Sequence, residues 1–185
     1  QTCALPISGK PFLRIEPTLL VGPPGSAKTS LAEDICHVLG IPSVTFDAGG
    51  NNDGMVFGIS RKWSNAAPGL HLDMLIEHRI ANPAIVIDEI EKVGNGYRNT
   101  NPLNLMLGLF EPRRARHLYD PFLETPLVMS HFSWIATANS IEPLSMPLRN
   151  RMRVIPCPLP TAEHLEPIAQ QLLTAEYEKR NTPEV

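Results

Sequence analysis

The sequence has 185 residues, with 16 basic and 19 acidic side chains and a formal net charge of -3. This length suffices for one α/β domain with a small appendage, and 43% hydrophobic against 19% charged residues excludes a disordered tail. The mean hydropathy of -0.08 argues against a membrane protein, and the nearly balanced charge argues against broad binding of nucleic acid.

The cysteines Cys3, Cys36 and Cys157 are far apart and have no paired spacing. They predict neither a disulfide framework nor a zinc site, which favours a reducing, cytoplasmic setting. The six histidines lack metal-ligand spacing and are interpreted as surface or packing residues. The chain opens on Gln1 without a signal-peptide pattern, so we interpret residues 1–17 as a flank at the edge of a fragment.

The first predicted elements are a strand, a tight loop and a helix in immediate succession. The apolar run 18–21 predicts a buried strand, and the Gly-Pro-Pro-Gly that follows predicts a sharp turn. A helix is predicted from Thr29, with Gly40 at its C-terminal cap. Its apolar stripe is expected to consist of Leu31, Ile35, Val38 and Leu39.

The remaining elements alternate between strands and helices. Further strands are predicted at residues 43–47, 84–87, 133–137 and 153–156, and further helices at 69–79 and 102–110. Prolines 156, 158 and 160 then predict a hinge before an amphipathic helix that contains Pro167. Alternation of this kind favours a mostly parallel, doubly wound sheet covered on both faces.

The loop after the first strand matches a phosphate-binding loop, in which backbone N–H groups wrap phosphate oxygens at a helix N-terminus. Lys28 is expected to contact the β- and γ-phosphates, and the Thr29 hydroxyl to bind Mg²⁺. Ala27 stands where such loops usually have glycine, adding a methyl group where unusual backbone dihedrals are needed. The alternative is a Gly/Pro turn that only caps a helix. The predicted nucleotide-binding residues here are Gly22, Pro23, Pro24, Gly25, Ser26, Ala27, Lys28, Thr29 and Ser30.

Two acids end the apolar strand near residue 87, in a Walker B pattern. Asp88 is expected to hold Mg²⁺ through its water shell, and Glu89 to act as the general base on the attacking water. The alternative is that acids end this strand only because the chain returns to solvent there.

Together these motifs resemble the AAA+ ATPases, and most specifically the ATPase module of Lon-type proteases and Lon-like relatives. The resemblance covers residues 18–156 in the family's order. It is carried by the stretches GPPGSAKTSL, IDEIEK, LMLGLFEP, WIATANS and PLRNRMRVI. It implies a P-loop NTPase sheet with strand order 5-1-4-3-2, ATP and Mg²⁺ as ligands, a homo-oligomeric ring, usually a hexamer, and a protein substrate.

The resemblance also implies roles for residues outside the loop and the acidic pair. Asn139 resembles sensor 1, which orients water near the γ-phosphate, although it is alternatively an ordinary turn residue. Arg151 resembles the arginine finger that acts on a neighbouring subunit, with Arg149 as the near competitor, and both are alternatively solvated surface charges. Lys62 and Trp63 match in type the pore loop that grips a polypeptide; the alternative is a tryptophan packed under a loop.

We therefore expect an ATPase core over residues 18–158 and the start of a helical lid over 159–185, with the lid's sensor 2 arginine not reached. The expected function is Mg²⁺-dependent ATP hydrolysis that remodels or translocates proteins. The alternatives are a nucleotide-gated scaffold with little hydrolysis and the ATPase half of a Lon-type protease. No guanine-reading Asn-Lys-x-Asp motif and no identifiable Ser-Lys dyad is present, and the basic run 113–117 is interpreted as a solvated loop.

Overall fold

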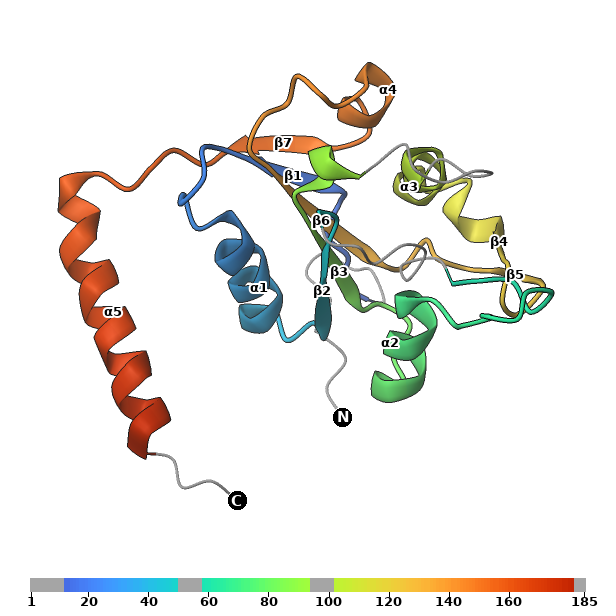
Figure 1. Ribbon diagram of the computed structural model, residues 1–185, viewed down its shortest axis with the longest axis horizontal. Coiled ribbons are helices and arrows are strands. Elements are labelled where there is room, and N and C mark those ends of the chain that lie inside the picture. The colour runs from blue at the N-terminus through green and yellow to red at the C-terminus, as the bar shows by residue number, and fades with distance from the viewer. Residues whose placement is uncertain (1–11, 50–57, 94–101, 182–185) are drawn as a thin grey trace.

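The computed structural model describes residues 12–49, 58–93 and 102–181, and its centre is a parallel five-stranded sheet (Figure 1). The spatial order of the strands is β2-β3-β6-β1-β7. Their bounds are β1 Thr18–Val21, β2 Ser43–Asp47, β3 Ala84–Asp88, β6 Ser133–Ala138 and β7 Arg153–Pro156. Counted in chain order within this sheet, the strands read 5-1-4-3-2, so the predicted topology and the α/β P-loop fold are confirmed.

The strand register brings the motif-bearing segments to one edge of the sheet. Val21 pairs with Ala138 across β1 and β6, and Asp47 pairs with Asp88 across β2 and β3. Because all five strands are parallel, their carboxyl ends meet at the same edge, where loops carry functional groups in open α/β sheets. The phosphate loop, the acidic pair and Asn139 all follow strands at this edge.

Alternating side chains of the sheet form two cores. Leu20, Val86 and Ile135 pack with Ala32 and Cys36 of helix α1 (Lys28–Val38) on one face. The larger core on the other face contains side chains from three strands and from helix α3 (Pro102–Phe110). Its members include Leu19, Ile85, Ile87, Trp134, Met106, Leu109 and Phe110. The burial of alternate residues on opposite faces follows from the two-residue period of a strand.

Helix α1 differs from the prediction in the face that it buries. Val38 is 81% exposed and Leu31 is 42% exposed, whereas Ala32 and Cys36 are fully buried. Helix α2 (Leu70–His78) buries His71, Leu72 and Met74. The expected stripe of Leu70, Met74 (or Leu75) and His78 is thus right at Met74 and wrong at His78, which is exposed. In both helices the predicted extent is nearly right and the predicted stripe is partly wrong, since Ile35 and Leu39 of the first stripe do pack against the core.

Several short elements were not predicted. A hairpin of β4 (Leu118–Asp120) and β5 (Thr125–Leu127) forms a second, antiparallel sheet. The short helix α4 covers Met146–Arg149, and single 3-10 turns cover Ile90–Lys92 (η1) and Ala115–His117 (η2). The basic run 113–117 is therefore not only a solvated loop, because Ala115 is fully buried in η2.

The last strand leads away from the sheet into a separate arm, helix α5 (Ala162–Asn181), as Figure 1 shows. The predicted helix and its internal Pro167 are present.

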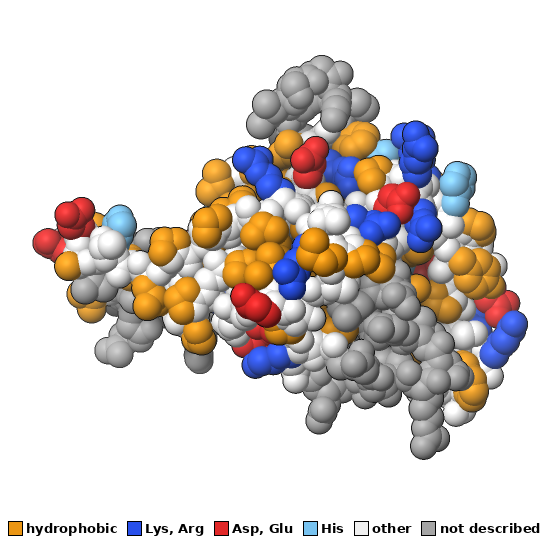
Figure 2. Space-filling model, turned by 90° about the horizontal axis from the view of Figure 1, so that it is seen from above, with side chains coloured by type: hydrophobic (Ala, Val, Ile, Leu, Met, Phe, Trp, Pro, Cys, Tyr) orange, Lys and Arg blue, Asp and Glu red, His pale blue; other side chains and the backbone are white. Residues whose placement is uncertain are grey.

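The proline-rich connection borders an apolar hollow of about 300 Å³, lined by Pro158, Leu159, Pro160, His164, Pro167 and Ile168. Along this arm hydrophobic side chains are exposed (Figure 2), among them Leu173 and Tyr177, each 71% exposed. Of the helices in the described ranges, none has the length and apolar character needed to cross a membrane.

The connection after β7 also touches the beginning of the phosphate loop. The Cys157 N–H donates to the Val21 carbonyl at 2.7 Å. A Cβ added to Gly22 would lie 1.9 Å from the Cys157 carbonyl oxygen. Only glycine therefore fits at position 22 with the connection in its present place.

Candidate active site

Lys28 begins helix α1 directly after the loop, and its side chain is only 7% exposed. Its ammonium contacts the Gly22 carbonyl at 2.9 Å, the Pro23 carbonyl at 3.0 Å and Oδ1 of Asn139 at 3.1 Å. Ser26 Oγ lies farther away, at 3.5 Å. The lysine thus links the phosphate loop to the residue that follows β6, with all three ammonium protons used.

The phosphate loop leaves the start of α1 without a side-chain cap. Ala27 occupies the N-cap position in a left-handed conformation (φ 57°, ψ 29°) and makes no capping hydrogen bond. Gly25 before it has φ 81°. The first backbone N–H groups of a helix have no partner within the helix, and uncapped groups of this kind are suited to bind an anion. Pro23, Pro24, Gly25 and Ser30 are exposed around this turn.

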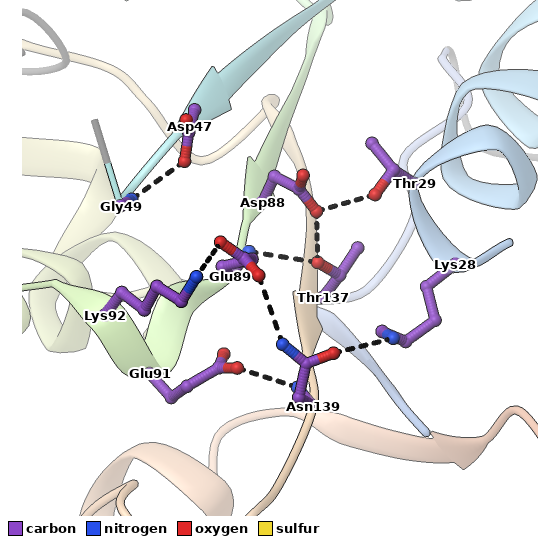
Figure 3. A network of polar contacts seen from close by, with 10 residues as sticks. All are labelled: Lys28, Thr29, Asp47, Gly49, Asp88, Glu89, Glu91, Lys92, Thr137 and Asn139. Carbon is purple, nitrogen blue, oxygen red and sulfur yellow. Dashed lines mark hydrogen bonds and ion pairs between the residues drawn. The ribbon is translucent and has the colours of Figure 1, made fainter. Parts of the chain in front are cut away.

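Thr29 and Asp88 join the loop to the acidic pair (Figure 3). The Thr29 hydroxyl donates to Asp88 Oδ1 at 2.6 Å. The Thr137 hydroxyl donates to the same oxygen and accepts the Glu89 N–H at 3.0 Å. Asp88 is therefore held by two hydroxyl groups from two different elements, α1 and β6.

Glu89 lies between Asn139 and Lys92. Its backbone is left-handed (φ 53°, ψ 49°), which is uncommon for a residue with a side chain and recurs at functional sites. Oε1 accepts a hydrogen bond from Asn139 Nδ2 at 3.1 Å, and Oε2 lies 2.5 Å from the Lys92 ammonium. Hydrogen bonding to Glu89 is the largest cause that raises the pKa of Lys92.

Asn139 is the centre of this polar network. It accepts from Lys28, donates to Glu89, and its backbone N–H donates to Glu91 Oε1 at 2.8 Å. The second oxygen of Glu91 is buried, and no described residue forms a hydrogen bond with it. The structure thus brings Lys28, Thr29, Asp88, Glu89 and Asn139 into one network, drawn in Figure 3.

Arg151 and Arg149 lie outside this network. Arg151 donates to the Pro147 carbonyl at 2.9 Å, and its guanidinium lies 3.4 Å from Glu111 Oε2. Arg149 donates to the carbonyls of Leu144 and Glu142, at 2.7 and 2.8 Å. The contacts of Arg149 are to its own loop, whereas Arg151 has one backbone contact and one ion pair.

Trp63 lies on a turn that the Ile59–Ala67 bridge closes, and it is 63% exposed. It is therefore not packed under a loop. The turn lies beside the β4–β5 hairpin, because Arg61 stacks over Phe122 with 4.8 Å to the ring centroid. Lys62 contacts Glu124 at 3.9 Å.

Sequence reasoning assigned no role to Thr137, Glu91 or Lys92. Thr137 precedes Asn139 by two residues, so the two-residue period of a strand was a usable signal for their common side. Glu91 and Lys92 lie in the quoted stretch IDEIEK, but their contacts depend on the η1 turn. That turn was not predicted.

The fold and this network define a P-loop ATPase of the AAA class. Residues 18–158 match the family described as "ATPase family associated with various cellular activities (AAA)". The chain belongs to this family, so it is a nucleotide-binding ATPase domain.

The chain is also similar to Lon proteases. It is 36% identical over 153 residues to "Lon protease homolog, mitochondrial" of Drosophila melanogaster, covering 82% of this chain and 15% of that protein. It is 34% identical over 165 residues to "Lon protease homolog 2, peroxisomal" of Spinacia oleracea, covering 89% and 18%. The mitochondrial homolog of Saccharomyces cerevisiae is 34% identical over 160 residues, covering 86% and 14%. The chain thus spans less than a fifth of the length of these relatives.

These relatives contradict the predicted cytoplasmic setting, because their names place them in mitochondria or peroxisomes. The prediction rested on cysteine content. Unpaired cysteines report a reducing environment and do not distinguish one reducing compartment from another. Within the described residues, Cys36 and Cys157 are free and buried.

Proposed function

We propose that the polar network binds ATP with Mg²⁺, and that hydrolysis of this ATP drives the movement of a protein substrate. The observation that carries the proposal is the 2.6 Å contact between Thr29 and Asp88, which joins the phosphate loop to the acidic pair. Asn139 supports it by contacting both Lys28 and Glu89.

Lys28 and the loop amides are proposed to hold the phosphates. On binding, the ammonium of Lys28 would exchange its carbonyl contacts for β- and γ-phosphate oxygens. The small residues Gly22, Gly25 and Ala27 allow the loop backbone to lie close to the phosphates. Two of them, Gly25 and Ala27, have left-handed conformations. Family membership supports ATP as the nucleotide.

The donor set at Thr29 and Asp88 fits Mg²⁺. This ion prefers hard oxygen ligands and is usually held by one or two carboxylates together with phosphates and water. Thr29 Oγ1 and Asp88 Oδ1 are such oxygens, already 2.6 Å apart. When bound, Mg²⁺ neutralises charge on the phosphates.

Glu89 is proposed as the general base that takes a proton from the attacking water, with Asn139 holding its carboxylate. Arg151 is proposed to act on a neighbouring subunit, in a ring of identical chains. The Arg151 side chain is 30% exposed, and within the described ranges it forms one long ion pair, to Glu111, so the guanidinium is available for a second acidic or phosphate group.

Lys62 and Trp63 are proposed to contact the protein substrate. An indole that is 63% exposed presents a large apolar surface next to two basic side chains, Arg61 and Lys62. We also propose that α5 begins a helical lid, since its exposed apolar side chains require a partner surface.

The test is a Glu89→Gln variant of the complete protein. We expect near-normal ATP binding by titration calorimetry, because the variant keeps Lys28, Thr29 and Asp88. Phosphate release should fall by about 100-fold or more, the usual contribution of a general base. Glu77→Gln, an exposed acid on α2, is the matched control. Undiminished turnover in Glu89→Gln would refute the assigned base, whereas tight binding without release by the wild-type ring would favour a nucleotide-gated scaffold.

A second candidate is that this chain is the ATPase part of a Lon-type protease. The relatives support it, because their names describe proteases of which this chain covers only a small part. The complete protein should then degrade an unfolded protein substrate in the presence of ATP. Glu89→Gln should stop that degradation as well as phosphate release; degradation that continues without hydrolysis would contradict this candidate.

A further inference from the structure

Lys92 is directed back to the residue that begins its own turn. The 3-10 turn η1 starts right after Glu89, and the Lys92 N–H donates to the Glu89 carbonyl at 2.8 Å. Ile90 anchors the turn because it is fully buried. Although the Lys92 side chain is 52% exposed, its ammonium lies 2.5 Å from Glu89 Oε2. Backbone and side chain thus both connect Lys92 to Glu89.

The two donors to Glu89 approach different oxygens of its carboxylate. Asn139 Nδ2 contacts Oε1 at 3.1 Å, and Lys92 contacts Oε2. A carboxylate held at both oxygens cannot rotate freely, and one donor cannot impose this alone.

The end of β2 leaves room for this ion pair. A Cβ added to Gly49 would lie 3.0 Å from Lys92 Cδ and 3.3 Å from Glu89 Oε2. The Gly49 N–H donates to Asp47 Oδ1 at 2.8 Å. The ion pair therefore lies against the backbone of Gly49, unlike an ion pair between two side chains in open solvent.

We propose that Lys92 is a positioning residue that, together with Asn139, holds the Glu89 carboxylate in its working orientation. The inference rests on the proposed function, in which Glu89 is the base. No hydrogen bond joins Lys92 to Lys28, Thr29 or Asp88 (Figure 3). Lys92 therefore serves the chemical step and leaves nucleotide binding to the other residues.

The first test compares Lys92→Met with Lys92→Arg in the complete, assembled protein. Lys92→Met should lower kcat about 10-fold or more, while KM for ATP and the affinity for a non-hydrolysable analogue stay within about twofold. Lys92→Arg keeps a cationic donor and should recover most of kcat. Arg116→Gln, which removes an exposed cation from η2, should change neither, and thermal melting checks that all variants fold.

The second test leaves Lys92 in place. Gly49→Ala should crowd the ion pair and lower kcat without raising KM. Gly49 does not have a left-handed φ, so the alanine should add no backbone strain of its own. A readout apart from activity is the ammonium NMR signal of Lys92, which should shift in Glu89→Gln. An active wild type with unchanged kcat in Lys92→Met, or a Lys92 signal indifferent to Glu89→Gln, would overturn the role of Lys92. An inactive wild type would instead contradict the proposed function itself.

Discussion

Ala27 and Glu89 carry left-handed backbones at the two sides of the polar network, with φ of 57° and 53°. A side chain makes this conformation unfavourable by about 1–2 kcal/mol. At Ala27 the methyl group has no described role, and most phosphate loops resolve the conflict with glycine. At Glu89 the side chain is the proposed base, so the same free-energy cost accompanies the orientation of its carboxylate.

We predict that Ala27→Gly stabilises the domain. Relief of the left-handed conformation outweighs the extra chain entropy of glycine and should leave a net gain of about 0.5–1 kcal/mol. The measurement is urea unfolding. Ala32→Gly is the control. Ala32 is fully buried and lies in the right-handed helix α1, so this variant should lose about 1–2 kcal/mol of unfolding free energy. A less stable Ala27→Gly would show that the loop does not need this φ.

The residues of the polar network differ in how local the sequence pattern is that predicts them. Two contiguous motifs, each after an apolar strand, contain Lys28 with Thr29 and Asp88 with Glu89. The sequence could therefore predict these four residues. Thr137 meets Asp88 across 49 positions of chain, and Asn139 meets Glu91 across 48. Such contacts arise only when β3 and β6 pair, and no local pattern predicts which buried strands pair.

Helix α1 shows why an apolar stripe can be mislocated when the helix itself is predicted. Hydropathy marks Leu31 and Val38, but close packing on the sheet selects the small residues Ala32 and Cys36. Burial raises the pKa of the Cys36 thiol, so the residue packs as a small neutral side chain. Its thiol should consequently resist alkylation in the folded state.

At the level of helices we predict unequal effects of removing apolar side chains. Val38→Ala on α1 should change the free energy of unfolding by less than about 0.5 kcal/mol, because Val38 is 81% exposed. Leu109→Ala on α3 should lose about 2–5 kcal/mol, because Leu109 is fully buried in the larger core. Chemical denaturation of both variants measures the difference, and equal losses would mean that α1 buries another face in solution.

The β4–β5 hairpin was missed because its strands have three residues each and β5 contains Pro126. Three residues show too little alternation to indicate a strand, and proline argues against one. The hairpin is nevertheless anchored from α2, since His71 Nε2 lies 2.6 Å from Asp120 Oδ2 and both residues are buried. A histidine interpreted as a surface or packing residue therefore contacts a buried carboxyl group.

The whole sheet was predictable only through family resemblance. Alternating strands and helices indicate a parallel sheet, but they fit several strand orders. The order 5-1-4-3-2 was implied by the family resemblance alone, and the observed sheet confirms it. The proposed ring is a level above the single chain. Its candidate trace in this chain is Arg151, which among the described residues contacts Pro147 and Glu111 and none of the residues of the polar network.

At the level of the assembly we predict complementation between two impaired variants. Arg151→Ala keeps its own base but offers no guanidinium to a neighbour, and Glu89→Gln has the opposite defect. Each ring alone should lose at least about tenfold in phosphate release, and mixed rings should exceed the sum of the two. Arg113→Ala, an exposed arginine, is the control. Absence of recovery on mixing would contradict action between subunits.

The tight fit between Gly22 and the Cys157 carbonyl places the connection to the arm directly against the start of the phosphate loop. A Cβ on Gly22 would lie 1.9 Å from the Cys157 carbonyl oxygen, so no side chain fits between the two backbones. We expect a movement of α5 to be transmitted to the phosphate loop through main-chain atoms alone, with no side chain between them. The position of the arm and the position of the loop backbone at Gly22 are therefore expected to change together.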